Sequence, residues 1–351
     1  MQDKQRVLVT GAGGFIGGWV VELFHLCGRS HVRAGLRKWS SGARVGRFPV
    51  EIVLCDVLNE GQVDSAVKGV DAIVHCAYGS AETTVQGTRN MLEASLKHGI
   101  RRFVHLSTID IYGTREGEVD ETSPAEHAGS DYGDSKIEAE KLCWQYYERG
   151  LPVSILRPSI VYGPYCKLWV VKFAERIKSG NWGVFDGIGD GVCNLVYVKD
   201  LVDAIALGLD SPRAPGEAFN VNGSETISWN DYFNALNDAL GLPQLKPVGS
   251  QKSRLRSLVS MPVRVAARYV QNHYGDLVTT LYRQSALAKR IMKRTEQSLK
   301  TTPSTVELAQ FSRKSHYSIK KANLLLGYDP KTDIQTGLRI SADWLRHETA
   351  S

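Results

Sequence analysis

A glycine-rich turn at residues 10–17 constrains the fold of this chain more than any other feature. The segment Thr10-Gly11-Ala12-Gly13-Gly14-Phe15-Ile16-Gly17 follows the apolar run 7–9 and precedes a predicted helix over 15–27. Glycines spaced three apart at 11, 14 and 17 permit a tight turn, a close backbone approach and close helix–strand contact. A helix beginning here directs N–H groups and its positive dipole end at the turn. The pattern predicts a strand–turn–helix unit that binds the diphosphate of a dinucleotide.

Short apolar runs and helical patterns alternate through the first half of the chain. The sequence predicts further strands at 32–36, 51–55, 72–76 and 103–107, a helix at 85–98, and returning strands at 153–156 and 217–221. This alternation indicates βαβ units, and the continuous apolar character of the runs is typical of buried parallel strands. The expected fold class is α/β, a Rossmann-type doubly wound parallel sheet.

Composition changes along the chain divide it into two regions. Residues 163–193 are rich in glycine and aromatic residues, typical of loops over a ligand, and residues 223–351 are mostly helical in pattern. A chain of 351 residues suits one large or two intimate domains. We expect a Rossmann dinucleotide-binding domain over 1–162 and 194–222. We expect a smaller, mostly helical substrate-binding region over 163–193 and 223–351.

Composition excludes several classes of function. The chain is 42% hydrophobic and 23% charged, as in ordinary globular proteins, and its net charge of +6 is too mild to indicate nucleic acid binding. Its six cysteines form no Cys-x-x-Cys pair and have no histidine cluster beside them, so we expect no metal site. We see no membrane-spanning run and no secretory signal, and therefore expect a cytoplasmic protein with a small-molecule substrate.

Two cations follow the second predicted strand, where dinucleotide-binding folds that prefer NAD place an acid. Arg37 can bind a phosphate through its forked guanidinium, and Lys38 adds a point charge. We therefore expect a 2′-phosphate clamp and NADP rather than NAD; two solvated surface cations are the alternative. Asp56 and Val57, after the third strand, would flank the adenine, unless Asp56 is simply a helix N-cap.

Tyr132 and Lys136 stand four residues apart at the start of a predicted helix that reaches residue 148. This spacing puts both side chains on one helix face, where the positive charge of Lys136 can lower the pKa of the phenol. Thr108, at the end of the preceding strand, can hydrogen-bond the same substrate oxygen. The constellation predicts proton transfer; an accidental, solvated surface pair is the alternative reading of Tyr-x-x-x-Lys.

Together with the glycine turn, these motifs resemble the extended short-chain dehydrogenase/reductase family, of the NAD-dependent epimerase/dehydratase type. The resemblance covers nearly the full length, through segments 71–77, 87–90, 107–113, 156–158, 162–164, 189–191, 196–198, 321–322 and 326–328. It implies that Thr108 is the catalytic hydroxyl, Tyr132 the acid/base and Lys136 its support, which also holds the nicotinamide ribose. It also implies cofactor contacts from Phe15, Ile16, Cys76, Ala77, Tyr78 and Pro158. We further expect a homodimer.

The chain departs from the family pattern at three places. Gln86 stands where the family often has Asn, which alters a hydrogen bond near the cofactor. Asn194 occupies the segment in which many nucleotide-sugar members carry an Arg for the diphosphate. Ile109 and Asp110 replace the acidic pair of the sugar 4,6-dehydratases, so we expect no loss of water from the substrate.

The resemblance leaves three functions open. The first is a reductase or epimerase acting on a nucleotide-activated sugar, and the second is a reductase or dehydrogenase of an apolar ring alcohol, sterol-like or dihydroflavonol-like. The third is a non-catalytic NADP-sensing protein.

Residues 252–300 contain eleven Lys or Arg and two acids. We expect this segment either to form a solvated basic face or to contact an anionic substrate or membrane surface.

Several residues have ordinary structural readings beside functional ones. We expect His75 and His105 to be core or strand-end histidines rather than ligands. Cys166 and Trp169 either line the substrate cleft or simply pack. Asp200 is expected as the N-cap of a helix over 201–209.

Overall fold

The computed structural model describes residues 4–127, 129–249, 251, 253–255, 257–258, 262, 290 and 301–348. Its internal contacts divide the chain into two units. The sheet unit comprises Met1–Tyr165, Asn194–Ser224 and His316–Asp333, and the helical unit comprises Cys166–Cys193, Glu225–Ser315 and Ile334–Ser351.

The division differs from the expected boundaries mainly at 316–333, which belong to the sheet unit, as do 163–165 and 223–224. The segment 316–333 forms α11 (Lys320–Leu326), which packs on strand β12 and helix α6 of that unit.

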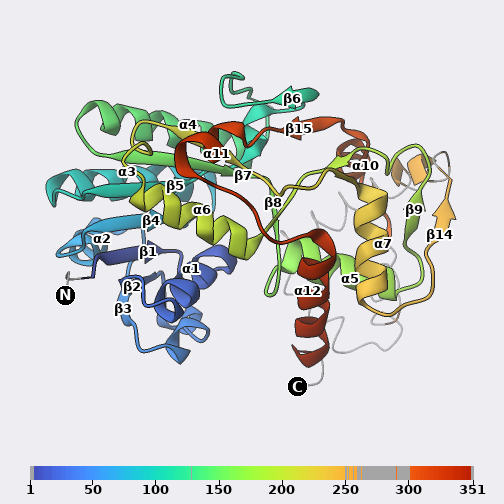
Figure 1. The fold of residues 1–351 in the computed structure, drawn as a ribbon, viewed down its shortest axis with the longest axis horizontal. Coiled ribbons are helices and arrows are strands. Elements are labelled where there is room, and N and C mark those ends of the chain that lie inside the picture. The colour runs from blue at the N-terminus through green and yellow to red at the C-terminus, as the bar shows by residue number, and fades with distance from the viewer. Residues whose placement is uncertain are drawn as a thin grey trace. The chain divides into compact units, whose positions relative to one another are not determined.

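A seven-stranded parallel sheet forms the centre of the sheet unit (Figure 1). Its strand order is β12-β7-β5-β4-β1-β2-β3. The bounds are β1 (Arg6–Thr10), β2 (His31–Leu36), β3 (Glu51–Leu54), β4 (Ala72–His75), β5 (Arg102–Leu106), β7 (Val153–Pro158) and β12 (Ala218–Val221). The order of connection reverses between β1 and β4, and open α/β sheets bind ligands beyond the carboxyl ends of the strands at such a point.

Helices cover both faces of this sheet, which confirms the doubly wound Rossmann-type fold. One face carries α2 (Glu60–Val67), α3 (Ala81–Lys97) and α4 (Asp131–Glu148). The other carries α1 (Phe15–Leu26), α6 (Val198–Asp210) and α11 (Figure 1).

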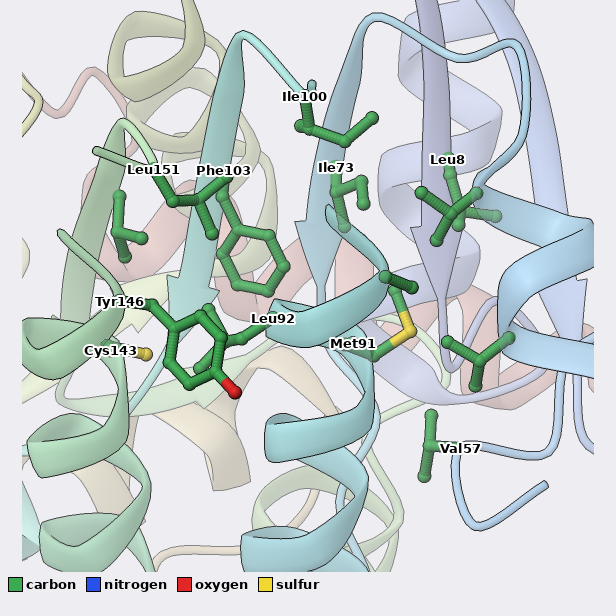
Figure 2. Packing of buried hydrophobic residues seen from close by; sticks show 14 of the residues in the cluster. Leu8, Val57, Ile73, Met91, Leu92, Ile100, Phe103, Cys143, Tyr146 and Leu151 are labelled. Carbon is green, nitrogen blue, oxygen red and sulfur yellow. The ribbon is translucent and has the colours of Figure 1, made fainter. Parts of the chain in front are cut away.

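The first face packs through a continuous apolar cluster (Figure 2). Leu8, Ile73 and Phe103 project from three adjacent strands and are fully buried against Met91 of α3 and Cys143 of α4. Burial of such side chains stabilises a fold by about 1.5–3 kcal/mol each. The cluster therefore holds α4, and with it Tyr132 and Lys136, rigidly on the sheet.

Short elements complete the sheet unit. They are β8 (Ile160–Tyr162), paired in parallel with β11 (Leu195–Tyr197), β6 (Gly117–Val119), paired with β15 (Ser315–Tyr317), and the 3₁₀ turns η1 (Trp39–Ser41), η2 (Val45–Arg47) and η3 (Ile109–Tyr112).

The described part of the helical unit contains helices and two small strand pairs. Helical elements with defined bounds are the π-helical turn η4 (Lys167–Val171), α5 (Lys172–Lys178), α7 (Trp229–Ala239), α10 (Thr305–Ser312) and α12 (Ile334–Glu348), and residues 251, 253–255 and 257–258 are also helical. The strand pairs are β9 (Gly183–Phe185) with β14 (Lys246–Val248), and β10 (Val192–Cys193) with β13 (Ile227–Ser228). The expectation of loops over 163–193 was therefore wrong for 167–178, where apolar residues at helical spacing pack inward.

Aromatic rings fill the core of the helical unit. Phe173, Trp229, Phe233 and Phe311 are buried, and the rings of Trp229 and Phe311 lie 4.7 Å apart between centroids. Aromatic pairs at this separation add about 0.5–1.5 kcal/mol beyond their burial.

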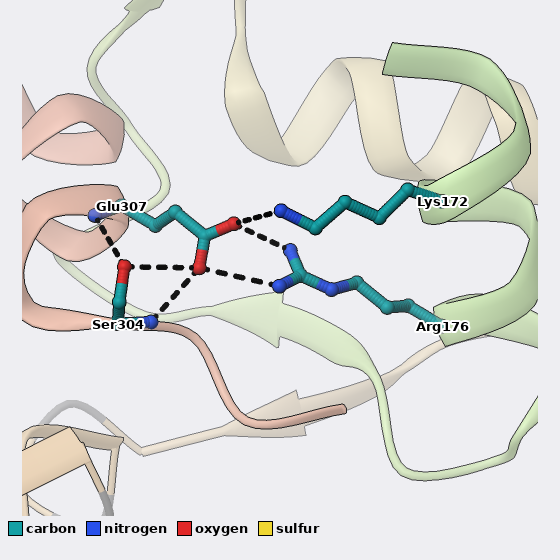
Figure 3. A network of polar contacts seen from close by, with 4 residues as sticks. All are labelled: Lys172, Arg176, Ser304 and Glu307. Carbon is teal, nitrogen blue, oxygen red and sulfur yellow. Dashed lines mark hydrogen bonds and ion pairs between the residues drawn. The ribbon is translucent and has the colours of Figure 1, made fainter. Parts of the chain in front are cut away.

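A mostly buried carboxylate joins α5 to the start of α10 (Figure 3). Glu307 forms ion pairs with Arg176 at 2.8 Å and with Lys172 at 2.9 Å. Its second oxygen accepts from the backbone N–H of Ser304, which completes a capping box at the start of α10.

Candidate functional site

The glycine turn forms a cradle that only residues without side chains can line. Gly11 adopts φ +65°, and a Cβ there would lie 3.0 Å from the backbone of Ala77, at the end of β4. A Cβ on Gly17 would lie 2.3 Å from the Gly11 carbonyl oxygen, and one on Gly14 would lie 3.1 Å from the same atom. Gly14 is the N-cap of α1, which has no acidic residue in its first turn, so the positive helix end remains available to an anion.

The ends of β1 and β4 are tied together beneath this cradle. The Thr10 hydroxyl lies 2.8 Å from His75 Nδ1 and accepts from the N–H of Ala77 at 3.3 Å. The other ring nitrogen of His75 lies 3.2 Å from the hydroxyl of Thr88 on α3. His75 is therefore a buried core histidine, as expected, and it braces the strand ends where Cys76, Ala77 and Tyr78 begin.

The expected adenosine-binding residues lie at the ends of β2 and β3. Arg37 and Lys38 are exposed directly after β2. Asp56 follows β3 and accepts from the N–H of Leu58, whereas Asn59 caps α2 by accepting from Gln62. The N-cap alternative for Asp56 was therefore wrong.

The next residue, Val57, contributes to the same corner from the backbone. The amide of Asn90 donates to the carbonyl of Val57 at 2.9 Å, and Gln86 donates to Asn90 at 2.7 Å. Gln86 on α3 thus supports the loop after β3 through Asn90.

Thr108 and Tyr132 come from neighbouring elements. Thr108 is buried at the end of β5 and caps η3 by accepting from the N–H of Asp110. Tyr132 lies in the first turn of α4, where the Ser130 hydroxyl accepts from Gly133 as the helix cap. Tyr132 is 40% exposed as a residue, but desolvation of its hydroxyl and the nearby Asp110 carboxylate raise the pKa of Tyr132 to about 12, although hydrogen bonding to Thr108 opposes this. Tyr132 therefore carries its proton at neutral pH.

Lys136 extends into the interior one turn further along α4. Its residue is 3% exposed, and Nζ donates to the carbonyl of Leu106 at 2.6 Å. Burial lowers the pKa of Lys136 to about 8. The expectation that Lys136 lowers the pKa of Tyr132 was wrong for this arrangement, because the ammonium is directed to the β5 carbonyl and the groups that affect the phenol are Asp110, Thr108 and Tyr78.

A buried polar network behind these residues was missed by sequence reasoning. Arg157, which precedes the buried Pro158, donates to both carboxylate oxygens of Glu140 at 3.0 and 2.7 Å. Its remaining nitrogen donates to the Tyr112 hydroxyl, which in turn donates to Asn220 at 2.8 Å. The signal that could have found the network is the i,i+4 spacing of Lys136 and Glu140 on a helix with a buried face.

Other singled-out residues have structural roles. His105 is fully buried and stacks on His75, with ring centroids 5.5 Å apart. Asn194 is buried and accepts from the amide of Asn222 at 3.1 Å and from the N–H of Tyr317 at 3.4 Å. These two hydrogen bonds hold the Asn194 side chain in the interior of the sheet unit.

Cys166 and Trp169 pack within the helical unit. Cys166 is 3% exposed and accepts from the N–H of Trp169, whose ring stacks on Phe173. Asp200 is not the helix N-cap, because α6 begins earlier, at Val198. Its carboxylate instead accepts from the backbone N–H groups of Lys331 and Thr332.

The residues at the carboxyl edge of the sheet fit a dinucleotide. The cradle at Gly11 and Gly17 is closed to any Cβ, and the positive end of α1 faces a turn without acidic residues. Such backbone is what a diphosphate requires. Within the described ranges, no three His, Cys, Asp or Glu side chains are arranged to hold a metal ion. None of the described helices is both long and apolar enough to cross a bilayer.

The fold and the cradle define a dinucleotide-binding α/β protein. A family model for the NAD dependent epimerase/dehydratase family matches residues 7–222. The chain belongs to this family, whose members are NAD-dependent enzymes of the extended short-chain dehydrogenase/reductase type.

Relatives within the family act on different substrates. A dTDP-glucose 4,6-dehydratase from Streptomyces antibioticus is 31% identical over 72% of this chain and 82% of its own length. A 3beta-hydroxysteroid-dehydrogenase/decarboxylase isoform 2 from Arabidopsis thaliana is 27% identical over 88% of this chain, which spans 54% of that relative's length. The structure of a UDP-glucuronic acid 4-epimerase from Bacillus cereus in complex with NAD matches with a TM-score of 0.71 at 19% identity, covering 98% of this chain and 99% of that one.

Proposed function

We propose that this chain is an NAD(P)-dependent oxidoreductase that transfers a hydride at a secondary alcohol or ketone. The observation that carries the proposal is the placement of Thr108, Tyr132 and Lys136 in the same unit as the glycine cradle, on elements that end or begin at the carboxyl edge of one sheet. The bound dinucleotide would supply or accept the hydride, and the protein would supply orientation and proton transfer.

Each of the three side chains has a role that its surroundings support. Tyr132 keeps its proton at neutral pH and is therefore suited to protonate a ketone oxygen as hydride arrives. The hydroxyl of Thr108 can hydrogen-bond the same oxygen. Lys136 would hold the nicotinamide ribose, and Pro158, buried at the end of β7, would lie beside the nicotinamide.

Two substrate classes fit this chemistry. Nucleotide-activated sugars are the first, because dehydratases and epimerases of such sugars are relatives or structural neighbours. Apolar ring alcohols are the second. This class is favoured by the hydroxysteroid-dehydrogenase relative. It is also favoured by Asn194, which hydrogen-bonds interior groups and cannot replace a diphosphate-binding arginine. Retention of all three proton-transfer residues argues against the third option, a non-catalytic NADP sensor.

A substrate panel tests the function and separates the two classes. UDP- and dTDP-hexoses and 3β-hydroxysteroids would each be incubated with the protein and NAD(H) or NADP(H), with nicotinamide absorbance and product mass as readouts. We expect redox chemistry or epimerisation without loss of water, because Ile109 cannot exchange a proton. A product lighter by one water would overturn this reading of the site, and binding of cofactor without turnover of any compound would favour the sensor.

The choice between the two dinucleotides belongs to the same proposal. Exposed Arg37 and Lys38 at the end of β2 support NADP, whereas the similar solved structures contain NAD. We propose NADP, because cations at this position attract the 2′-phosphate and no ribose-binding acid takes their place.

Three wider expectations complete the proposal. We propose a cytoplasmic location, which suits the free cysteines. We also propose a homodimer, and light scattering at several protein concentrations tests it. Docking of the basic segment 252–300 to an acidic membrane concerns residues that, apart from 253–255, 257–258, 262 and 290, lie outside the described residues. Sedimentation with neutral and acidic vesicles tests it, because electrostatic binding requires acidic lipid and weakens with salt.

A further inference from the structure

Arg44 lies in the segment 37–48, which follows β2 and carries the two proposed phosphate-binding cations. Its side chain is 11% exposed and lies between two aromatic rings, with Cζ 4.0 Å from the ring centroid of Tyr165 and 4.9 Å from that of Trp19. One guanidinium nitrogen donates to Glu22 of α1 at 2.7 Å. A cation over aromatic faces is held more strongly where water is excluded. These four side chains, the cation–π cluster, therefore fix the guanidinium in position and in plane.

Gly18 of α1 makes room for this guanidinium. A Cβ at Gly18 would lie 3.1 Å from Nη1 of Arg44 and 3.2 Å from its Cδ. The dinucleotide turn requires glycine at Gly11, Gly14 and Gly17 and makes no demand on the next position. The cation–π cluster therefore accounts for a glycine that the turn leaves unexplained, and it places Arg44 directly beside the first turns of α1.

Tyr165 presents its ring to this cluster from a strained backbone. Its φ is +71°, and no other non-glycine residue in the described part of the chain has a positive φ. Residues with a side chain rarely adopt this region. The ring lies over Arg44, the hydroxyl accepts from Arg47 at 3.3 Å, and the carbonyl of the preceding Pro164 accepts from the indole of Trp19 at 3.0 Å. The conformation is thus held by contacts with α1 and with the segment after β2.

Backbone hydrogen bonds connect the cation–π cluster to the two proposed phosphate-binding cations. The N–H of Ser41 donates to the carbonyl of Lys38 at 3.1 Å, and that of Gly46 donates to the carbonyl of Gly42 at 2.8 Å. A Cβ at Gly13 would lie 2.5 Å from the Ser41 carbonyl oxygen, so the same segment rests on the glycine turn. A displacement of the cluster would therefore shift the exposed cations relative to the cradle.

We propose that Arg44 is a positioning residue for the dinucleotide. Its place between the two rings fixes the segment 37–48 against the glycine turn, and Arg37 and Lys38 then meet the 2′-phosphate without having to be ordered on binding. The guanidinium itself is already occupied by Glu22 and the rings, so it acts through the segment. This inference rests on the proposed function, which supplies the dinucleotide and its 2′-phosphate.

Binding of NADPH and NADH, measured by calorimetry, tests the positioning role. Arg44→Lys keeps the charge and loses the planar group that stacks on both rings. NADPH should bind about tenfold more weakly to this variant, a part of what a charged hydrogen bond contributes, and NADH should be affected much less. A merely structural role would weaken both dinucleotides equally.

Glu22→Ala separates positioning from a direct contact between Arg44 and the phosphate. If Arg44 bound the phosphate by its charge, removal of the neighbouring carboxylate would tighten NADPH binding. If Arg44 acts by its position, loss of the ion pair should loosen the segment and weaken NADPH binding. The two readings therefore predict changes of opposite sign.

Tyr165→Gly tests the cluster from outside the segment 37–48. Glycine adopts the same φ without strain and removes one of the two rings. NADPH binding should weaken as in Arg44→Lys, and the double variant should add little, because both changes disrupt one contact. Arg149→Lys is the matched control: Arg149 lies 4.3 Å from the ring centroid of Tyr146, and its replacement should leave the ratio of the two affinities unchanged.

Hydrogen exchange without any dinucleotide measures the order of the segment by itself. Amides of residues 41–48 should exchange about tenfold faster in Arg44→Lys and Tyr165→Gly, because local opening becomes easier, and at the unaltered rate in Arg149→Lys. Unchanged exchange, equal losses for NADPH and NADH, or tighter NADPH binding in Glu22→Ala would overturn the positioning role. Absence of binding of either dinucleotide to the unaltered protein would instead overturn the proposed function, while exchange would still report the effect of Arg44 on the segment.

Discussion

Two arginine–glutamate pairs of nearly the same geometry, each with a buried arginine, occur in different units of this protein. In the sheet unit Arg157 contacts Glu140 at 3.0 and 2.7 Å, and in the helical unit Arg176 contacts Glu307 at 2.8 and 3.2 Å. Both arginine side chains are less than 10% exposed. By chemistry alone the two pairs are equivalent.

Their neighbours make them different. Glu307 also holds Lys172 and the backbone N–H of Ser304, so its contacts join α5 to the start of α10. Glu140 lies one turn from buried Lys136, and Arg157 leads through Tyr112 toward the element capped by Thr108. The comparison teaches that the same ion-pair chemistry stands in different surroundings. Removal of either charge leaves the other uncompensated in both pairs, but only Arg157 and Glu140 lie beside the proposed proton-transfer residues.

The largest expected effect tests whether Tyr132, on the same helix as Glu140, transfers a proton to the substrate. Tyr132→Phe should lower turnover by about 10²–10⁴-fold, because the phenolic proton has no replacement. Binding of the dinucleotide, measured by titration, should change little because the glycine cradle and Lys136 remain. Tyr147→Phe removes an exposed phenol of the same helix and should be nearly silent. Normal turnover of Tyr132→Phe with any accepted substrate would refute the assignment.

The next prediction compares the two pairs in stability. Glu307→Gln should cost about 3 kcal/mol in free energy of unfolding, because Arg176 is left as an uncompensated buried charge. Glu140→Gln should cost a similar amount for the same reason. Urea denaturation followed by circular dichroism measures both. A loss below about 1 kcal/mol in either variant would show that this arginine finds another partner or solvent.

A pH titration tests the Arg176–Glu307 pair of the helical unit. Burial would raise the pKa of Glu307, but Arg176, the Ser304 N–H and Lys172 lower it to about 2 from an ordinary 4.5. Because the folded-state pKa is depressed, the stabilisation is complete above about pH 4.5 and is lost as the pH falls toward 2. Melting temperatures from pH 7 to 2 should therefore fall less steeply in Glu307→Gln. Parallel curves for the two proteins would contradict this.

The smallest expected effect concerns an arginine that is exposed rather than buried. Arg37→Ala should weaken NADPH binding by about 1.5–3 kcal/mol, the range for a charged hydrogen bond, and leave NADH binding nearly unchanged. Titration of both cofactors into both proteins measures this. Arg213→Ala, another exposed arginine, is the control. Equal losses for NADPH and NADH would exclude a 2′-phosphate clamp.

The sequence by itself was sufficient for features that depend on local spacing. Glycines three apart after an apolar run predicted the turn before α1, and the i,i+4 spacing of Tyr132 and Lys136 predicted their common helix. The alternation of apolar runs and helical patterns predicted the doubly wound sheet. These features are readable because backbone conformation over a few residues follows from local sterics and periodicity.

Only the tertiary structure decided which distant side chains meet. Arg157 and Glu140 are 17 residues apart, and Arg176 and Glu307 are 131 apart. The sequence placed Asp200 at a helix start, but its carboxylate binds backbone 131 and 132 residues away. The directed lysine and the raised pKa of Tyr132 likewise depend on other elements, which bury Lys136 and place Asp110 and Tyr78 near the Tyr132 hydroxyl. Charge partners and solvent exclusion are set by the packing of whole elements, and no local pattern in the sequence records them.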